Sequence, residues 1–515
     1  MPAAMTPGSD TSRMASVAFI RSRRKSATAF ARILGCIVAF CAAGADSAAP
    51  ASTLKLAECR LEGSAASVRC GWMTLPENRE APQGAQVRIH VAVIPSLRAT
   101  PEPDPLVILT GGPGQAASDF YGTLGGAFGR IRRNRDIVLI DQRGTGKSNR
   151  LDCDFDVETD FASVDPQQLA LLQERARTCL KAMAGDPRFY TTSAAVRDLD
   201  DIRAALGYPA VNIYGVSYGT RVAQHYVRRY PSRVRSVILD GAVPVDLALG
   251  PDAAPQAQRA LDALFDRCAA DAGCNTAFPQ ARAQFDALRA QLQREPRRTQ
   301  LPDPIDAQPV DTGFGDVELG AAVRMLTYSD ETAAVLPLLI HEAQTLQQPQ
   351  GLVAQYLMIK HSTDTQIAYG MHFAVVCSED APRWAQEKTS EAALAASYMG
   401  ASFMAGMKAI CDVWPHGFVD KDFNAPLASA APALILSGAN DPVTPPDYGV
   451  RALSSFKQGR HLVLAGQGHG QIATGCMPRI VAQFIESADA AKLDASCLDA
   501  VTPAPFMLSR TATAP

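Results

Sequence analysis

Short apolar runs recur along the chain, and each ends at glycine or at a polar residue. They occupy residues 106–109, 137–140, 211–214, 237–239, 434–436 and 461–464. Such runs are typical of strands that are buried on both faces of a sheet. Residues 86–94 alternate between apolar and polar positions, which predicts a further strand.

Amphipathic patterns with helical spacing separate several of these runs. They cover residues 194–206, 218–230 and 477–485, and Pro231 ends the second of them. Alternation of strands and helices predicts an α/β fold with a mostly parallel, doubly wound sheet and helices on both faces.

The alternation fails between residues 244 and 426, where the patterns are mainly helical. Helices are predicted over residues 257–268, 279–293, 317–325, 332–346 and 391–406, with a proline-rich loop from residue 296 to residue 309. We therefore expect a helical cap at 244–426, inserted between core segments 46–243 and 427–500. The tail, residues 501–515, is small and polar, and we expect it to be poorly ordered.

The first 45 residues have the pattern of a signal peptide. The basic segment Arg-Ser-Arg-Arg-Lys at 21–25 precedes an apolar run at 33–43, and the small residues Ala43, Gly44 and Ala45 stand at its end. The run is shorter than the ~20 apolar residues that a membrane-spanning helix needs. The sequence thus predicts an exported protein, periplasmic or extracellular, without stable membrane insertion.

Composition and charge narrow the possible partners. Apolar residues make up 47% of the chain and charged residues 20%, as in ordinary globular proteins. The formal net charge of −3 shows no basic excess, so we expect no nucleic-acid partner. The oligomeric state is left open.

Ten cysteines lie beyond the predicted signal peptide. They are Cys59, Cys70, Cys153, Cys179, Cys268, Cys274, Cys377, Cys411, Cys476 and Cys497. An even number in an exported protein favours disulfides, and we expect pairing between neighbours in sequence, although spacing alone leaves other connectivities open. Neither Cys-x-x-Cys nor His-Glu-x-x-His occurs, so we expect no metal and no cofactor.

A Gly-x-Ser-x-Gly motif carries the strongest chemical signal. Gly215-Val216-Ser217-Tyr218-Gly219 follows a predicted buried strand and opens a predicted helix. This context is typical of the nucleophile elbow, a strained turn that exposes a serine hydroxyl at the end of a sheet. The motif predicts Ser217 as a nucleophile, and the alternative is a plain glycine turn between strand and helix.

A serine nucleophile needs a base and an acid that orients the base. In this fold class the order along the chain is serine, acid, histidine. Asp441 and His469 have that order, and each follows a predicted strand. Asp412 and Asp447 compete with Asp441 but lie at no strand end. The remaining histidines are expected to be packing or surface residues: His90, His225, His341, His361, His372, His416 and His461.

The transition state of acyl transfer carries an oxyanion, which needs two hydrogen-bond donors. The backbone N–H of Tyr218 is the expected first donor, because it follows the serine. The second should come from the glycine-rich loop at residues 111–114, and we favour Gly112, with Gly111 as the near alternative. A plain turn is the competing interpretation of this loop.

Together these motifs resemble the prolyl-aminopeptidase branch of the α/β-hydrolases, and most closely the secreted tripeptidyl-aminopeptidase-like enzymes of bacteria. The resemblance covers about residues 55–500. It rests on Gly-Gly-Pro-Gly at 111–114, Asp-Gln-Arg-Gly-Thr-Gly-Lys-Ser at 141–148, the elbow, Cys-Gly-x-x-x-Leu-Pro at 70–76 and Asp-Pro-Val-Thr-Pro at 441–445. It implies Ser217 as nucleophile, Asp441 as orienting acid and His469 as base. Many relatives have histidine before the glycine loop, whereas this chain has Thr110.

Three functions are compatible with these residues. The first is an aminopeptidase acting on peptides with a free N-terminus, which needs a carboxylate for the substrate ammonium. Glu379, beside Cys377, is the candidate for that role, and a surface acid is the alternative. The second is an esterase or lipase-like hydrolase with the same three residues. The third is a non-catalytic binding protein of hydrolase fold.

Overall fold

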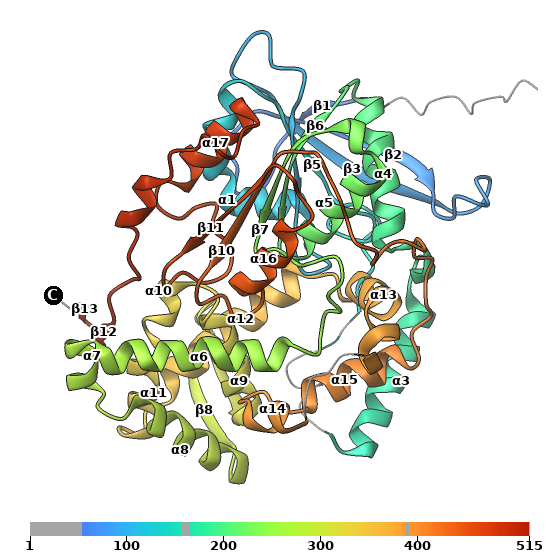
Figure 1. Cartoon of the computed structure of the whole chain (residues 1–515). Coiled ribbons are helices and arrows are strands. Elements are labelled where there is room, and N and C mark those ends of the chain that lie inside the picture. Colours follow the sequence, from blue (N-terminus) through green and yellow to red (C-terminus); the bar gives the residue numbers. More distant parts are fainter. Residues whose placement is uncertain (1–53, 154, 156–163, 387–390, 514–515) are drawn as a thin grey trace, which may run out of the picture. The chain divides into compact units, whose positions relative to one another are not determined.

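A mixed nine-stranded sheet forms the centre of the chain (Figure 1). The computed structural model describes residues 54–513, apart from residues 154, 156–163 and 387–390. In sheet order the strands are β1 (Ala57–Cys59), β2 (Val68–Pro76), β3 (Gln86–Ile94), β5 (Ile137–Ile140), β4 (Leu106–Leu109), β6 (Val211–Val216), β7 (Val234–Asp240), β10 (Ala433–Gly438) and β11 (Gly459–Leu464). From β5 to β11 all pairings are parallel, which confirms the predicted sheet type.

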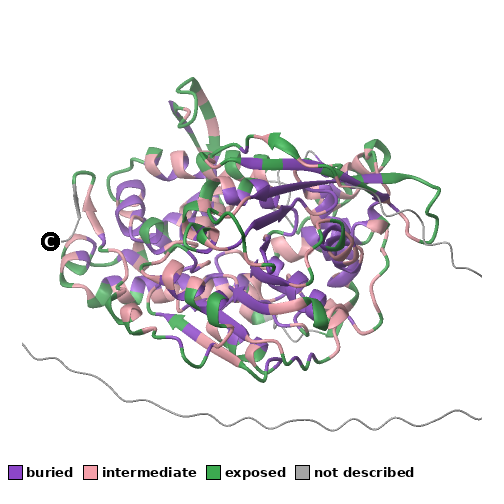
Figure 2. Cartoon of the chain, turned by 90° about the horizontal axis from the view of Figure 1, so that it is seen from above, coloured by how far each residue is buried: buried purple, intermediate pink, exposed green. Residues whose placement is uncertain are grey.

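Helices cover both faces of this sheet, as a doubly wound fold requires. One face packs on α4 (Thr192–Ala205), α5 (Tyr218–Arg229) and α16 (Pro446–Leu453). The other packs on α1 (Ala117–Leu124) and α17 (Met477–Ser487). Every residue of β4, β5, β6 and β10 is buried, and Figure 2 shows buried strands in the interior of the molecule. Burial on both faces explains why the sequences of these strands are nearly continuous apolar runs.

The region between β7 and β10 is a helical insertion with a hydrophobic core of its own. It lies below the sheet in Figure 1. Its helices are α6 (Ala253–Ala270), α7 (Ala272–Ala277), α8 (Ala281–Arg294), α9 (Asp316–Leu326), α10 (Asp330–Ala333), α11 (Leu336–Gln344), α12 (Gln350–Gln366), α13 (Tyr369–Glu379), α14 (Glu391–Ala396) and α15 (Ser402–Cys411). A helix that precedes β6, α3 (Pro166–Ala182), packs against α13 and α15.

The predicted proline-rich loop at 296–309 is instead a hairpin, so that prediction was wrong. Strands β8 (Arg297–Pro302) and β9 (Pro309–Phe314) pair in antiparallel register. Their prolines Pro302 and Pro309 form the last pair, next to the turn, where a missing N–H is tolerated. Thr299 and Leu301 are buried on the same face. The prolines of this segment masked the alternation of buried and exposed residues that would have predicted strands.

Among the described residues, five disulfides join cysteines that are neighbours in sequence, which confirms the predicted pairing. They are Cys59–Cys70, Cys153–Cys179, Cys268–Cys274, Cys377–Cys411 and Cys476–Cys497. The first joins β1 to β2, which the sequence analysis did not identify as strands, and the fourth joins α13 to α15. Five disulfides fit a protein of an oxidising compartment.

The structure bears on the prediction about the membrane but not on the prediction of a signal peptide. Within the described part of the chain, no helix combines the length and the apolar character needed to cross a bilayer. The predicted signal peptide, residues 1–45, lies outside the described residues. The predicted domain boundaries stay predictions.

The described part of the tail is ordered, contrary to the expectation from its composition. Strands β12 (Met507–Ser509) and β13 (Ala512–Thr513) form a small hairpin. Phe506 is only 1% exposed and packs into the core of the insertion. The guanidinium of Arg267 lies 4.0 Å from the centre of its ring. One buried aromatic residue therefore anchors a segment that is otherwise small and polar.

We predict that Phe506→Ala lowers the free energy of unfolding by about 3–5 kcal/mol, the usual cost of emptying a buried aromatic site. Ile305→Ala is the matched control, because Ile305 is 54% exposed. Thermal or chemical denaturation of both variants measures the difference. Equal stability of the two variants would show that the tail does not contribute to the core.

Candidate active site

Ser217 forms the turn between β6 and α5 on its own. Its φ of 55° and ψ of −126° place it in a region that residues with a Cβ rarely adopt. Its N–H donates to the carbonyl of Asp240 (2.9 Å), and its carbonyl accepts from the N–H of Thr220 (2.9 Å). Neighbouring backbone thus holds a strained turn that presents the hydroxyl at the end of the sheet.

The two motif glycines allow this turn because no side chain fits beside either of them. A Cβ at Gly215 would lie 2.5 Å from the carbonyl oxygen of Gly219. A Cβ at Gly219 would collide with the carbonyl oxygen of Leu109 on the neighbouring strand β4. The motif therefore lets α5 start close against the sheet, which is the context predicted for a nucleophile elbow.

Asp441 and His469 meet across two loops that follow adjacent parallel strands. Asp441 lies after β10 and His469 after β11. His469 Nδ1 is 2.7 Å from Asp441 Oδ2. Because a carboxylate oxygen only accepts, Nδ1 carries the proton, and Nε2 of the neutral ring is left as the acceptor.

The environment keeps Asp441 ionised although it is buried. Burial alone would raise its pKa, but the charge of His469 and hydrogen bonds from His469 and Thr444 outweigh burial and lower it. For His469, burial alone would lower the pKa, but the charge and hydrogen bond of Asp441 raise it above the ordinary value. The pair is therefore arranged to stabilise an imidazolium.

Thr444 completes the hydrogen bonding of this pair. Its hydroxyl lies 2.7 Å from Asp441 Oδ2 and 3.1 Å from His469 Nδ1. The other carboxylate oxygen accepts the backbone N–H groups of Val443 (2.7 Å) and Thr444 (2.8 Å). With these contacts the carboxylate has little freedom to rotate.

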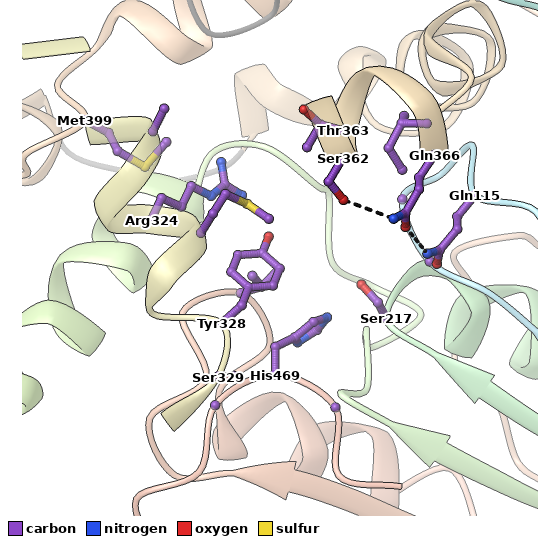
Figure 3. Close-up of a pocket in the computed structure, with 18 of the residues that line it drawn as sticks. Gln115, Ser217, Arg324, Tyr328, Ser329, Ser362, Thr363, Gln366, Met399 and His469 are labelled. Atoms are coloured by element: carbon purple, nitrogen blue, oxygen red, sulfur yellow. Dashed lines mark hydrogen bonds between the residues drawn. The ribbon is translucent and has the colours of Figure 1, made fainter. Parts of the chain in front are cut away.

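Ser217 and His469 line one cavity, and the His469 ring is directed toward the serine (Figure 3). No hydrogen bond joins Ser217 Oγ to the imidazole among the residues that the structure describes. Such contacts are often long without substrate and shorten in the reacting complex. The structure thus brings the three predicted residues together, with one hydrogen bond formed and one still to form.

The two predicted oxyanion donors come from different segments, the first turn of α5 and the glycine loop that follows β4. Tyr218 is the first residue of α5, so its N–H has no partner within the helix. Gly112 has a φ of 103°, and a Cβ there would lie 2.8 Å from Gly114 N. Gly111 is close as well, since its Cβ would lie 3.1 Å from the Cβ of Ser217. Both glycines line the cavity, so Gly111 remains the alternative to Gly112.

The cavity is large, and it is enclosed by the core and the insertion together. Its volume is about 1490 Å³, whereas ordinary ligand pockets measure about 300–1,000 Å³. Figure 3 shows Gln115, Gln366 and Ser362 on one wall, joined by hydrogen bonds, and Arg324 and Tyr328 on another. In the described part of the chain, no cluster of three His, Cys, Asp or Glu side chains is suited to hold a metal ion.

Glu379 lies outside the wall of this cavity. It is 2% exposed, and its carboxylate accepts the backbone N–H of Thr192 (2.6 Å) and lies 2.9 Å from the Thr192 hydroxyl. The guanidinium of Arg221 is 3.8 Å away. Burial raises the pKa of Glu379 to about 8, against the opposing charge of Arg221. A carboxyl that is mostly protonated at pH 7 is poorly suited to bind an ammonium.

Three further groups at the site were not identified from the sequence. The carbonyl of Tyr328 accepts the N–H of His469 (2.6 Å), and its ring meets the imidazole edge-on. Asp240 accepts the N–H of Gln471 (2.8 Å), and burial raises its pKa to about 6. His372, expected to be a packing or surface residue, lines the cavity. Asp240 ends β7, Tyr328 follows α9 and His372 lies in α13, so these groups reach the site through contacts between distant segments.

Comparison with known proteins identifies the family of this fold and site. The chain matches the family model described as alpha/beta hydrolase fold over residues 104–475, and it belongs to that family. This finding confirms the family and fold class expected from the motifs.

Curated relatives include peptidases and an esterase. Serine protease Hip1 of Mycobacterium tuberculosis H37Rv is 25% identical over 454 residues, 81% of this chain and 84% of that protein. Tripeptidyl aminopeptidase of Streptomyces lividans is 30% identical over 190 residues, 34% of this chain and 35% of that protein. Carboxylesterase B of M. tuberculosis CDC 1551 is 27% identical over 422 residues, 75% of this chain and 77% of that protein.

Among solved structures, a proline iminopeptidase from Mycobacterium smegmatis aligns with a TM-score of 0.35 at 18% identity. The alignment covers 82% of this chain and 99% of that protein. The family match and the curated relatives together support a serine hydrolase of the α/β-hydrolase fold.

We predict that Thr444→Val lowers kcat about 10- to 100-fold, because one hydrogen bond to a charged carboxylate is worth ~1.5–3 kcal/mol. Thr444→Ser keeps the hydroxyl and should retain most of the activity. Steady-state kinetics on one anilide substrate compare the two variants. Wild-type kcat in Thr444→Val would mean that the hydroxyl does not hold the acid.

Proposed function

We propose that this chain is a serine aminopeptidase in which Ser217, His469 and Asp441 form the catalytic triad. The single observation that carries the proposal is the 2.7 Å contact of His469 with Asp441, beside a serine on a strained turn that opens into the same cavity. That geometry supports acyl transfer through a covalent intermediate.

The first half-reaction forms an acyl-enzyme. Ser217 Oγ attacks the scissile carbonyl carbon while Nε2 of His469 takes its proton, and Asp441 stabilises the resulting imidazolium. The N–H groups of Tyr218 and Gly112 donate to the oxyanion. The imidazolium then protonates the leaving amine, which departs.

The second half-reaction uses the same groups with water as the nucleophile. His469 takes a proton from the water, which attacks the acyl carbon, and the oxyanion forms again between the same two donors. The imidazolium returns its proton to Ser217 Oγ as the carboxylic acid product leaves. Each proton that His469 accepts is thus given back within its own half-reaction.

The cavity favours a peptide substrate with a free N-terminus. Its volume exceeds the range for ordinary small-molecule pockets, which suits several residues of a peptide. Asp316, at the start of α9, and Glu331, beyond its end, line it and supply negative charge for an ammonium, and Arg289 and Arg324 line it as well. Glu379 does not line it, so we place the ammonium beside one of these two acids. Two of the similar proteins are named as a serine protease and a tripeptidyl aminopeptidase.

Anilides that carry one, two or three residues, each with a free and an acetylated N-terminus, test this substrate class. We expect kcat/KM for the free amine to exceed that of its acetylated partner roughly 10–100-fold, the value of one charged hydrogen bond. Ser217→Ala should remove turnover of every substrate. Equal turnover of both series, or hydrolysis of short acyl esters alone, would contradict the aminopeptidase proposal and favour an esterase.

The pH dependence of kcat/KM tests His469 as the base. Activity requires the neutral imidazole, and the raised pKa of His469 moves its protonation to higher pH. Activity should therefore rise with pH through a midpoint above the usual value of ~6.5. Asp441→Asn should lower that midpoint and reduce kcat about 10⁴-fold.

The matched control for this profile is Asp447→Asn, because Asp447 is an exposed acid close to Asp441 in sequence. It should leave both the midpoint and kcat unchanged. A wild-type midpoint at or below ~6.5 would contradict the assignment of the base.

We also propose that the protein is exported, to a periplasm or to the medium. The signal-like segment and the five disulfides support this location. Peptides with free N-termini are the proposed partners.

A further inference from the structure

We propose that α13, a helix of the insertion, positions both donors of the oxyanion hole, holding the Gly112 loop through His372 and the Tyr218 end of α5 through Glu379. This inference rests on the proposed function. It assigns positioning roles to two residues that touch neither nucleophile nor base.

The loop that carries Gly112 has little internal restraint. Gly112 and Gly114 have φ values of 103° and 114°, so no side chain limits the backbone at these two points. Within the loop, the N–H of Gln115 donates to Gly111 O (3.3 Å), and the hydroxyl of Thr110 donates to Gln115 O (2.7 Å). Both contacts close the ends of the loop and leave its middle unsupported.

The insertion supplies the missing support. His372 Nδ1 lies 3.1 Å from Pro113 O, and the N–H of Ala368 donates to Gly114 O (3.1 Å). Ile367 forms a β-bridge with Gln115. Consecutive loop residues are therefore bound by one short segment, which leads into α13 and includes its first turn.

His372 acts as a hydrogen-bond donor at this contact. A carbonyl oxygen only accepts, so Nδ1 must carry the proton. Burial lowers the pKa of His372 to about 4, which keeps the ring neutral at pH 7. The contact is thus an uncharged hydrogen bond that fixes the carbonyl next to the predicted donor Gly112.

The other end of α13 reaches the second donor. Glu379 binds Thr192, whose hydroxyl lies 2.6 Å from the phenol oxygen of Tyr218. Gln142 donates to the same phenol oxygen (3.1 Å). The next residue, Asp380, forms a buried ion pair with Arg221 of α5 (2.9 Å). These contacts fix the first turn of α5, where the Tyr218 N–H is expected to meet the oxyanion.

The helix itself is held firmly. Its residues from Phe373 to Glu379 are all buried, and Cys377 is bonded to Cys411 of α15. Oxyanion donors are effective only when they lie about 2.7–3.1 Å from the developing charge. Because one helix contacts the supports of both donors, docking of the insertion sets the distance between them.

Two nearly isosteric substitutions isolate the His372 contact. Asn offers an N–H close to the position of Nδ1, whereas Leu offers none. We expect His372→Leu to lower kcat about 10- to 100-fold and to leave KM within about twofold of the wild-type value. The decrease should not exceed the effect of losing a whole oxyanion donor, which is about 10²- to 10³-fold in kcat. His372→Asn should recover most of kcat.

Further measurements separate positioning from a general structural loss. A peptidyl boronic acid, which forms a tetrahedral adduct, should lose affinity for His372→Leu in parallel with kcat/KM. Thr192→Val, which removes the hydroxyl link to Tyr218, should also lower kcat without raising KM. His341→Leu is the control, because His341 lies in the same insertion and contacts Gln284 instead. Titration with a fluorophosphonate counts the folded, reactive sites in each preparation.

Wild-type kcat in His372→Leu would overturn the inference, as would a change in KM alone, which would mean direct substrate binding. Failure of His372→Asn to restore kcat at full titration would overturn it as well. If Glu379→Gln raises KM only for free-amino substrates, Glu379 binds the ammonium and its positioning role is wrong. If wild-type protein is not labelled by the fluorophosphonate, or if Ser217→Ala still turns over substrate, the proposed function itself fails.

Discussion

The turn at Ser217 is the constraint on which the rest of the site depends. A residue with a Cβ is held at a φ of 55° by backbone hydrogen bonds to Asp240 and Thr220. The turn exists only because Gly215 and Gly219 leave no side chain between α5 and the sheet. It places the hydroxyl, the start of α5 and the carboxyl ends of the parallel strands at one edge, and the loops after β10 and β11 then bring Asp441 and His469 to that edge.

Besides enclosing the cavity, the insertion holds the loop that carries Gly112. Loops on a sheet edge are mobile unless other elements hold them. In this chain the loop that carries Gly112 is fixed by backbone and side-chain contacts to residues 367–372 of the insertion. Under the proposed function, a substrate bound in the cavity contacts the same insertion that holds this loop, which would link binding to the chemical step.

The sequence pattern predicted those parts of the fold and site that are determined by residues close together in the chain. The apolar runs of β4, β5, β6 and β10 were recognisable because both faces are buried, and the elbow was recognisable because close packing demands glycine on each side of Ser217. Asp441 and His469 could be selected because each follows a predicted strand and they have the expected order along the chain. The disulfides followed from pairs that are close in sequence.

The rest depended on contacts between distant segments. Nothing in the pattern around Glu379 distinguishes a buried carboxyl bound to Thr192 from one that faces a cavity. Likewise His372 looked like a packing residue because its partner, Pro113, lies 259 positions earlier in the chain. Proline masked the hairpin of β8 and β9, and one aromatic residue, Phe506, orders a tail whose composition suggested disorder.

Peptide mapping by mass spectrometry after reaction with a fluorophosphonate tests the central claim most directly. The account predicts a single phosphonyl adduct, located on Ser217, that forms more slowly in His469→Ala and is absent in Ser217→Ala. An adduct on another residue, or unchanged labelling after loss of the imidazole, would contradict the convergence of these groups into one active site.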